Sequence, residues 1–215
     1  MTRVPPVHVI CTEKEAARTS FPDDLRGLVE AGRRELALHL RLRGVTDRRL
    51  YDVAVLVAEA ARETGGRCAI NGRPDVALTA RADAVQLGRG AIPIAAARAW
   101  LGDRLTIGAS VHAAAEATAA VTAGADYLLL GTIYPTPTHP GRPGAGPALV
   151  RETAAALARA GYGAVPVVAI GGIHSGRIGR VRAAGAVGVA VRRAVWASRD
   201  PPAALRDLID RFRSP

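Results

Sequence analysis

Eight short apolar segments alternate along the chain with segments of helical pattern, and this alternation constrains the fold more than any other feature. Strands separated by helices pair in parallel through right-handed crossovers. Eight such units in 215 residues predict an α/β fold of the (β/α)8 TIM barrel type, with an open doubly wound sheet as the alternative. The predicted strands span residues 7–12, 35–43, 68–71, 84–88, 106–110, 127–131, 165–170 and 186–191.

Length and composition limit the number of domains and the cellular location that we expect. The chain is 49% hydrophobic, enough for one sizeable core, so we expect a single barrel domain over residues 1–215. No run reaches the ~18–20 apolar residues of a membrane span, and residues 1–6 lack the apolar segment of a signal peptide. Cys11 and Cys68 lie in predicted strands and are expected to be buried, reduced thiols. We therefore expect a cytoplasmic protein with no membrane partner.

The net charge is +10, and Lys14 is the one lysine of the sequence. The arginines are scattered and the aromatic content is 4%, which favours neither a nucleic-acid patch nor a stacking surface. We expect no nucleic-acid partner. A Schiff-base aldolase needs a buried lysine, and Lys14 is its sole candidate here.

A stiff loop rich in proline and threonine follows the apolar run 127–130. Its prolines fix φ and remove backbone donors, so the loop cannot extend the sheet. Thr136 and Thr138 offer hydroxyl groups there, and His139 offers a side chain that titrates near neutral pH. The loop is either a surface turn or an anion-binding element with His139 as its acid/base group.

Active sites of barrels lie at the carboxyl ends of the strands. Polar candidates at the ends of strands two, three and five are Arg41, Arg43, Asn71 and Ser110. The two arginines could instead plug the barrel or lie at its other rim, and Asn71 could simply cap a turn. His39, on the same face as Arg41, is expected to be a core histidine.

The ends of strands seven and eight predict a phosphate site. Gly171 and Gly172 let backbone approach a ligand closely, and the loops after these two strands form the usual phosphate site of barrels. Val191 and Arg192 would complete it, the arginine through a charge-assisted contact. The alternative is that the glycine pair only turns the chain. Strands three and four end without a carboxylate pair, so no metal ligands are predicted.

These segments occur in one order along the chain: His39-Leu40-Arg41-Leu42-Arg43, Asn71-Gly72-Arg73-Pro74-Asp75-Val76-Ala77-Leu78, Val85-Gln86-Leu87-Gly88, Gly108-Ala109-Ser110-Val111-His112, Gly124-Ala125-Asp126-Tyr127, Gly131-Thr132-Ile133-Tyr134-Pro135-Thr136-Pro137-Thr138, Ile170-Gly171-Gly172-Ile173 and Gly185-Ala186-Val187-Gly188-Val189-Ala190-Val191. The series resembles the thiamin-phosphate synthase/thiazole tautomerase (TenI-like) superfamily. The resemblance implies a cytoplasmic, often dimeric (β/α)8 barrel of thiamin biosynthesis that binds a phosphorylated thiazole.

In the synthase branch, an aminopyrimidine diphosphate ionises with the help of Mg²⁺, and the nitrogen of thiazole phosphate attacks the cation. The resemblance implies a role for each candidate: Arg41, Arg43 and Ser110 on the diphosphate, Asn71 on the pyrimidine side, Thr136 and Thr138 near the thiazole phosphate, and Gly171, Gly172, Val191 and Arg192 on its phosphate.

Departures from the synthase pattern point to the other branch. Gly72 replaces an aspartate, and the stretch 86–91 lacks the second acid, so both expected Mg²⁺ ligands are missing. The first hypothesis is therefore a thiazole tautomerase-like enzyme that needs no cofactor. At the position of the branch's usual histidine this sequence has Thr132, so His139 is expected to act as the acid/base group instead. The alternatives are a synthase with a degenerate Mg²⁺ site and a non-catalytic regulatory relative that binds a phosphorylated ligand.

Overall fold

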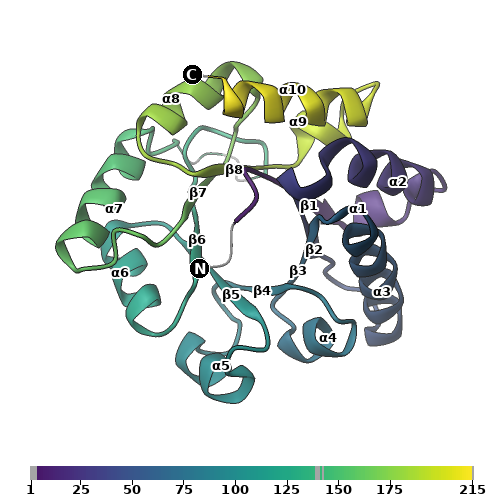
Figure 1. The fold of residues 1–215 in the computed structure, drawn as a ribbon, viewed down its shortest axis with the longest axis horizontal. Helices are drawn as coiled ribbons and strands as arrows, with labels where there is room; N and C mark the ends of the chain where they lie inside the picture. Colours follow the sequence, from purple (N-terminus) through teal and green to yellow (C-terminus); the bar gives the residue numbers. More distant parts are fainter. Residues whose placement is uncertain (1–3, 139–140, 142, 215) are drawn as a thin grey trace.

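Eight parallel strands close into a barrel in which each strand pairs with its sequence neighbours and β1 pairs with β8 (Figure 1). The computed structural model describes residues 4–138, 141 and 143–214. The strands are β1 (Val7–Thr12), β2 (Leu36–Arg41), β3 (Arg67–Asn71), β4 (Ala84–Leu87), β5 (Thr106–Val111), β6 (Tyr127–Leu130), β7 (Val167–Ile170) and β8 (Gly188–Val191). The predicted TIM barrel is confirmed, and the open sheet is excluded.

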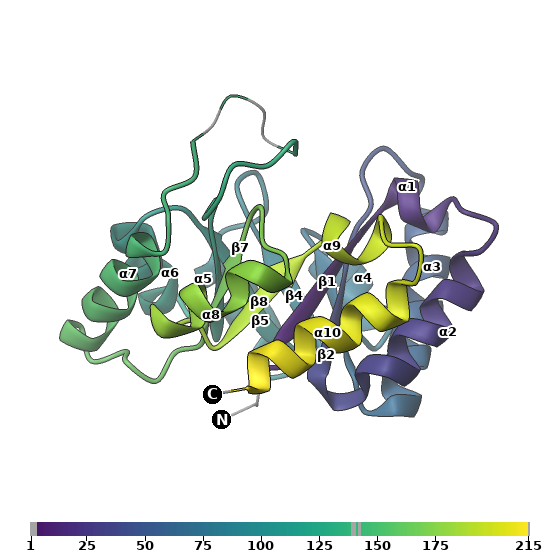
Figure 2. The ribbon, with the colours of Figure 1, turned by 90° about the horizontal axis from the view of Figure 1, so that it is seen from above.

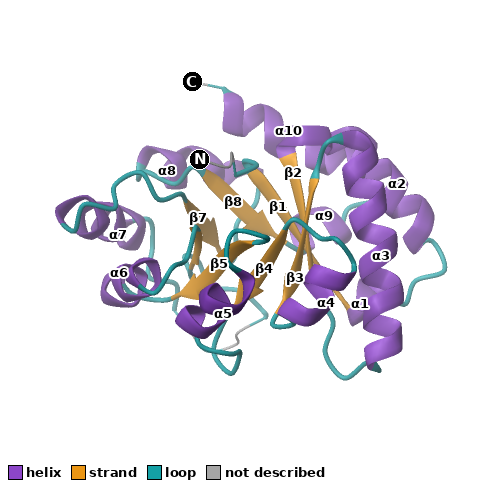
Figure 3. Ribbon diagram, turned by 60° about the horizontal axis from the view of Figure 1, so that its bottom comes forward, coloured by secondary structure: helices purple, strands orange, loops and turns teal. Residues whose placement is uncertain are grey.

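Helices surround the barrel (Figure 3). They are α1 (Glu13–Ala16), α2 (Phe21–Gly32), α3 (Asp47–Thr64), α4 (Pro74–Thr79), α5 (Ile94–Leu101), α6 (Ala114–Thr122), α7 (Ala148–Arg159), α8 (Ile178–Ala183), α9 (Arg193–Trp196) and α10 (Pro201–Arg213), with 3-10 turns η1 (Arg33–Glu35) and η2 (Ser175–Arg177). No helix among the described residues is long and apolar enough to cross a membrane.

Alternation along the strands separates two packed layers. Leu36, Leu38 and Leu40 of β2 point outward into the large cluster between strands and helices, as the period-two pattern predicts. The opposite face of each strand fills the barrel, where Ile10, Ala69, Tyr127, Leu129, Val168 and Ala190 form a smaller cluster. His39 is fully buried, as expected for a core histidine. Cys11 and Cys68 are buried free thiols, also as expected.

Element boundaries depend on local contacts that the sequence pattern does not show. Helix α3 starts at Asp47, because the Thr46 hydroxyl accepts a hydrogen bond from the Arg49 amide and caps it. The strand predicted over 35–43 ends at Arg41. The short helices α1 and α9, which follow β1 and β8, were not predicted, since four residues carry no helical period.

The two ends of the barrel differ. The carboxyl ends of the strands carry α1, α9 and the long segment between β6 and α7, which stands out from the barrel (Figure 2). The start of β1 and the end of α10 lie at the opposite end in the same view. The candidate site residues therefore lie away from the start of β1 and the end of α10.

The close packing of the barrel interior predicts a stability effect at Gly108 of β5. A Cβ at this position would overlap the Gln86 amide oxygen and the Tyr127 ring, both buried. We expect Gly108→Ala to lower the free energy of unfolding by about 1–3 kcal/mol, measured by urea denaturation. In the matched control, Gly179→Ala in α8, the Cβ meets nothing within 4 Å. That variant should gain up to about 1 kcal/mol from helix propensity; equal stability of the two variants would contradict the packing argument.

Candidate functional site

A cavity of about 790 Å³ opens at the carboxyl ends of the strands. Ten of the eleven predicted site residues line it: Arg41, Arg43, Asn71, Ser110, Thr136, Thr138, Gly171, Gly172, Val191 and Arg192. The eleventh, His139, lies outside the described residues. Arg41 and Arg43 thus lie at the cavity rather than at the far rim, although the structure does not test what any of these residues binds.

The described lining carries five arginines and no aspartate or glutamate: the arginines are Arg41, Arg43, Arg89, Arg192 and Arg193. Burial lowers the pKa of Arg41, and the positive charges of Arg43 and Arg192 lower it further. Its guanidinium has no ion-pair partner among the described residues. Arg89 and Arg192 have carboxylate partners outside the lining, Glu116 and Glu15. A lining that has no acid of its own and carries the unpaired charge of Arg41 is suited to hold an anion.

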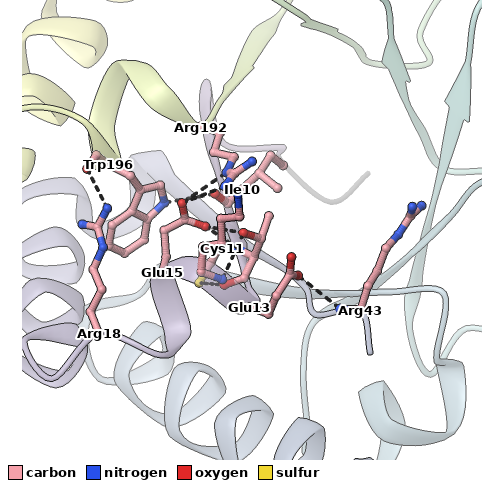
Figure 4. A network of polar contacts seen from close by, with 10 residues as sticks. Ile10, Cys11, Glu13, Glu15, Arg18, Arg43, Arg192 and Trp196 are labelled. Carbon is pink, nitrogen blue, oxygen red and sulfur yellow. Dashed lines mark hydrogen bonds and ion pairs between the residues drawn. The ribbon is translucent and has the colours of Figure 1, made fainter. Parts of the chain in front are cut away.

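Arg192 is held in place by a buried carboxylate (Figure 4). Its Nη2 lies 3.0 Å from Glu15 Oε1, while Glu15 Oε2 accepts hydrogen bonds from the Thr12 hydroxyl at 2.6 Å and the Thr12 amide at 2.8 Å. Burial raises the pKa of Glu15, but the Thr12 and Arg192 hydrogen bonds outweigh it and lower the pKa overall. Part of the Arg192 charge is therefore neutralised within the protein, unlike that of Arg41.

The β6–α7 segment packs closely on the glycine pair after β7. The Tyr134 amide donates to the Gly171 carbonyl at 3.0 Å. Gly171 and Gly172 have φ of 105° and 61°, and a Cβ on either would come within 2.6 Å of Thr132 or Pro135. The glycine pair is thus required by both its backbone conformation and its neighbours, whether or not a phosphate binds there.

Ser110 is fixed from β4. The buried Gln86 donates from its amide nitrogen to the Ser110 hydroxyl at 3.0 Å. This hydrogen bond between side chains of neighbouring strands holds the Ser110 hydroxyl at a defined point of the cavity wall.

Two cavity histidines were not predicted as site residues. His112 follows β5, and its Nδ1–H donates to the Gly131 carbonyl, which leaves Nε2 without a proton in the neutral ring. His174 follows Gly171-Gly172-Ile173 and also lines the cavity. Both histidines closely follow a predicted strand, and this position in the sequence could have identified them as cavity residues.

Residues 7–195 match the family model described as thiamine monophosphate synthase. This chain belongs to the thiamine monophosphate synthase family. It is 45% identical over 153 residues to the thiamine-phosphate synthase of Mycolicibacterium smegmatis, covering 71% of this chain and 65% of the relative. It is 42% identical over 194 residues to the thiamine biosynthesis bifunctional protein ThiM/ThiE of Symbiobacterium thermophilum, covering 89% of this chain and 38% of the relative.

A solved member of the family shares the fold along nearly the whole chain. Thiamine phosphate pyrophosphorylase from Pyrococcus furiosus superimposes with a TM-score of 0.83 at 30% identity, covering 97% of this chain and 96% of that one. The resemblance drawn from the ordered motifs is therefore confirmed. The match spans less than two thirds of the length of both sequence relatives, so their activities remain proposals for this chain.

The cavity residues do not fit the Mg²⁺ ion that the synthase branch implies. Mg²⁺ takes oxygen ligands and is usually held by one or two carboxylates. Gly72, and the pair Gly90 and Ala91, line the cavity where the pattern has acids. The nearby Asp47 and Asp75 instead bind Arg73, at 2.5 and 2.7 Å. The described residues contain no group of three or more His, Cys, Asp or Glu side chains placed to hold a metal.

Proposed function

We propose that this protein acts in the formation of thiamine phosphate and that its cavity binds a phosphorylated thiazole. The first candidate reaction is that of a thiamine-phosphate synthase, because relatives with 42% to 45% identity are named thiamine-phosphate synthase. The observation that carries the proposal is the acid-free, five-arginine cavity. The relatives give no specific support to the tautomerase reaction, which was the first hypothesis from the sequence.

In the proposed coupling, the bond between the pyrimidine methylene carbon and the diphosphate oxygen breaks, and the electron pair leaves with the diphosphate. The thiazole nitrogen then donates its lone pair to the methylene carbon. Arg41 and Arg43 would neutralise the departing charge, and the Ser110 hydroxyl would hydrogen-bond to the diphosphate. Gly171, Gly172 and Val191 would hold the thiazole phosphate through backbone groups, with Arg192 beside them.

A second candidate, thiazole tautomerisation, is favoured by the absence of an acid at position 72 and in the stretch 86–91. A proton transfer needs one placed acid/base group and no metal. His139 remains the predicted group. His112 is a further candidate, because its Nδ1–H is engaged by Gly131 and its Nε2 is a free acceptor. The third candidate is a non-catalytic protein that binds the phosphorylated ligand in the same cavity without converting it.

A product assay by mass spectrometry separates the three. Purified protein is incubated with aminopyrimidine diphosphate plus thiazole phosphate, and separately with the thiazole phosphate carboxylate tautomer alone. Thiamine phosphate at a catalytic rate supports the synthase proposal. Aromatised thiazole without thiamine phosphate supports the tautomerase, and binding without either product supports the non-catalytic relative.

Restoring the missing acids should create a metal response. Gly72 and Gly90 have φ of 75° and 83°, and a Cβ on either meets nothing within 4 Å. Asp and Asn both tolerate this conformation. In the Gly72→Asp/Gly90→Asp variant, we expect Mg²⁺ to strengthen aminopyrimidine diphosphate binding by about tenfold or more, as measured by calorimetry. The Gly72→Asn/Gly90→Asn variant has the same shape without the charge and should not respond. A tenfold Mg²⁺ response in the unmodified protein would contradict the fit argument.

Two finer expectations belong to the same proposal. A cytoplasmic location suits an enzyme that acts on small phosphorylated metabolites. A homodimer is also proposed, by likeness to the family, and sedimentation analysis of the purified chain tests it.

A further inference from the structure

Two successive peptide units after β7 are each held by their carbonyl group. The Gly171 carbonyl accepts a hydrogen bond from the Tyr134 amide at 3.0 Å. The Gly172 carbonyl accepts one from Nη1 of Arg177, which lies in η2, at 2.5 Å. Because the N–H and C=O groups of a trans peptide unit point in opposite directions, the amides of Gly172 and Ile173 point away from these two donors.

These two amides belong to the cavity wall. Gly172 and Ile173 line the cavity, and Arg177 does not. The described residues offer neither amide a hydrogen-bond acceptor. Neighbouring amides with free N–H groups beside a cavity are suited to hold an anionic oxygen.

Arg177 also holds the β6–α7 segment from behind this wall. Its guanidinium carbon lies 4.4 Å from the centroid of the Tyr134 ring, a cation–π contact. The Tyr134 amide in turn holds the Gly171 carbonyl. One arginine side chain therefore fixes both peptide units, directly at Gly172 and through Tyr134 at Gly171.

Glycine makes this hold necessary. The peptide unit that joins Gly171 to Gly172 has glycine on both sides, so it can turn over with little strain. In the turned orientation, the Gly171 carbonyl oxygen would face the cavity in place of the Gly172 amide. A carbonyl oxygen repels an anion that an amide would bind. The hydrogen bonds from Tyr134 and Arg177 stabilise the orientation that presents the amides.

We propose that Arg177 is a positioning residue for the phosphate of the ligand. From behind the cavity wall it fixes the Gly172 carbonyl and the Tyr134 ring, and so keeps the amides of Gly172 and Ile173 presented to the phosphate. It does not contact the ligand itself. The inference rests on the proposed function, since it takes the phosphate of thiazole phosphate to lie at the glycine pair, and it is the same for either candidate reaction.

The first test is binding of thiazole phosphate by Arg177→Met, measured by calorimetry. Methionine keeps an unbranched side chain beside the Tyr134 ring but has no donor for the Gly172 carbonyl. We expect the affinity for thiazole phosphate to fall roughly 10- to 100-fold, because a hydrogen bond to the charged phosphate is lost. The matching thiazole alcohol, which lacks the phosphate, should lose less than about threefold in affinity. A purely structural role would weaken the two ligands equally.

The control separates positioning from the loss of a positive charge. Arg180 is exposed on α8 and close to Arg177 in the sequence. Arg180→Met removes the same charge from the surface and should lower the affinity for thiazole phosphate by less than about threefold. At about 1 M salt, charges that act through solvent are screened within about 3 Å, so the roughly tenfold or greater loss in Arg177→Met should persist there.

Aminopyrimidine diphosphate reports that Arg177→Met has folded correctly, because it is proposed to bind at Arg41 and Arg43 and should bind with unchanged affinity. Three results would overturn the role of Arg177 and leave the proposed function standing: a loss below about threefold for thiazole phosphate, an equal loss for the thiazole alcohol or aminopyrimidine diphosphate, or a loss that disappears in high salt. If the unmodified protein binds no thiazole phosphate, the proposed function falls, and the role of Arg177 falls with it.

Discussion

Arg41→Gln is expected to weaken the binding of aminopyrimidine diphosphate by roughly 100- to 1,000-fold, because it removes a partly buried charge that faces the anion. Arg41 is the last residue of β2 and lies at the cavity wall. Burial and the positive charges of Arg43 and Arg192 lower its pKa, so the charged guanidinium is destabilised in the folded protein. A bound anion stabilises the charged guanidinium, and this stabilisation adds to the affinity for the anion. Calorimetry on the purified variant measures the effect, and Gln keeps most of the side-chain volume.

The control for Arg41 is an arginine of equal chemistry outside the cavity. Arg26 lies on α2 and forms an exposed pair with Asp23 at 3.1 Å. Exposed pairs contribute little, so Arg26→Gln should leave both binding and stability unchanged. A loss of less than about threefold in Arg41→Gln would remove this residue from the anion site.

His139→Gln is expected to lower thiazole tautomerisation by roughly 100-fold or more if His139 is the acid/base group. The glutamine keeps a hydrogen-bonding side chain but cannot exchange a proton near neutral pH. Turnover of the carboxylate tautomer, followed by ultraviolet absorbance, measures the change. His112→Gln is the informative partner, because His112 lines the cavity with Nε2 free.

The two histidine variants divide the possibilities for the tautomerase. A large loss in His139→Gln alone assigns the proton transfer to His139. A large loss in His112→Gln alone moves it to the end of β5. Unchanged turnover in His139→Gln removes that residue from the mechanism.

The barrel was predictable because its signals are local. The alternation of leucines in β2 indicates a strand, and glycines after the helices mark where the helices end. Together such signals give the order of strands and helices along the chain. In a barrel, this order alone brings the strand ends together, so Arg41, Asn71 and Ser110 could be placed at one cavity before any coordinates were known.

The contacts that tune the site were not predictable, since they join distant parts of the chain. Glu15 binds Arg192 across 177 positions of sequence, and His8 meets His39 across 31. Sequence periodicity carries no information about which buried polar groups will face each other. The same limit explains why His39 was expected in the core, while its partner His8 was not foreseen.

The glycine pair after β7 shows a different limit. Gly171 and Gly172 were predicted from the usual phosphate site of barrels, with a simple turn as the alternative. The structure adds a third reason, the close approach of Thr132 and Pro135. A sequence motif can therefore have a packing cause as well as a ligand-binding one, and only a binding measurement separates them.

Calorimetric titration of the unmodified protein with thiazole phosphate, in a buffer containing a metal chelator, tests the central claim most directly. The account predicts saturable binding at one site per chain, with the same affinity when excess Mg²⁺ replaces the chelator, because arginines and backbone groups hold the phosphate. Absence of binding under both conditions, or binding that appears only with Mg²⁺, would contradict it.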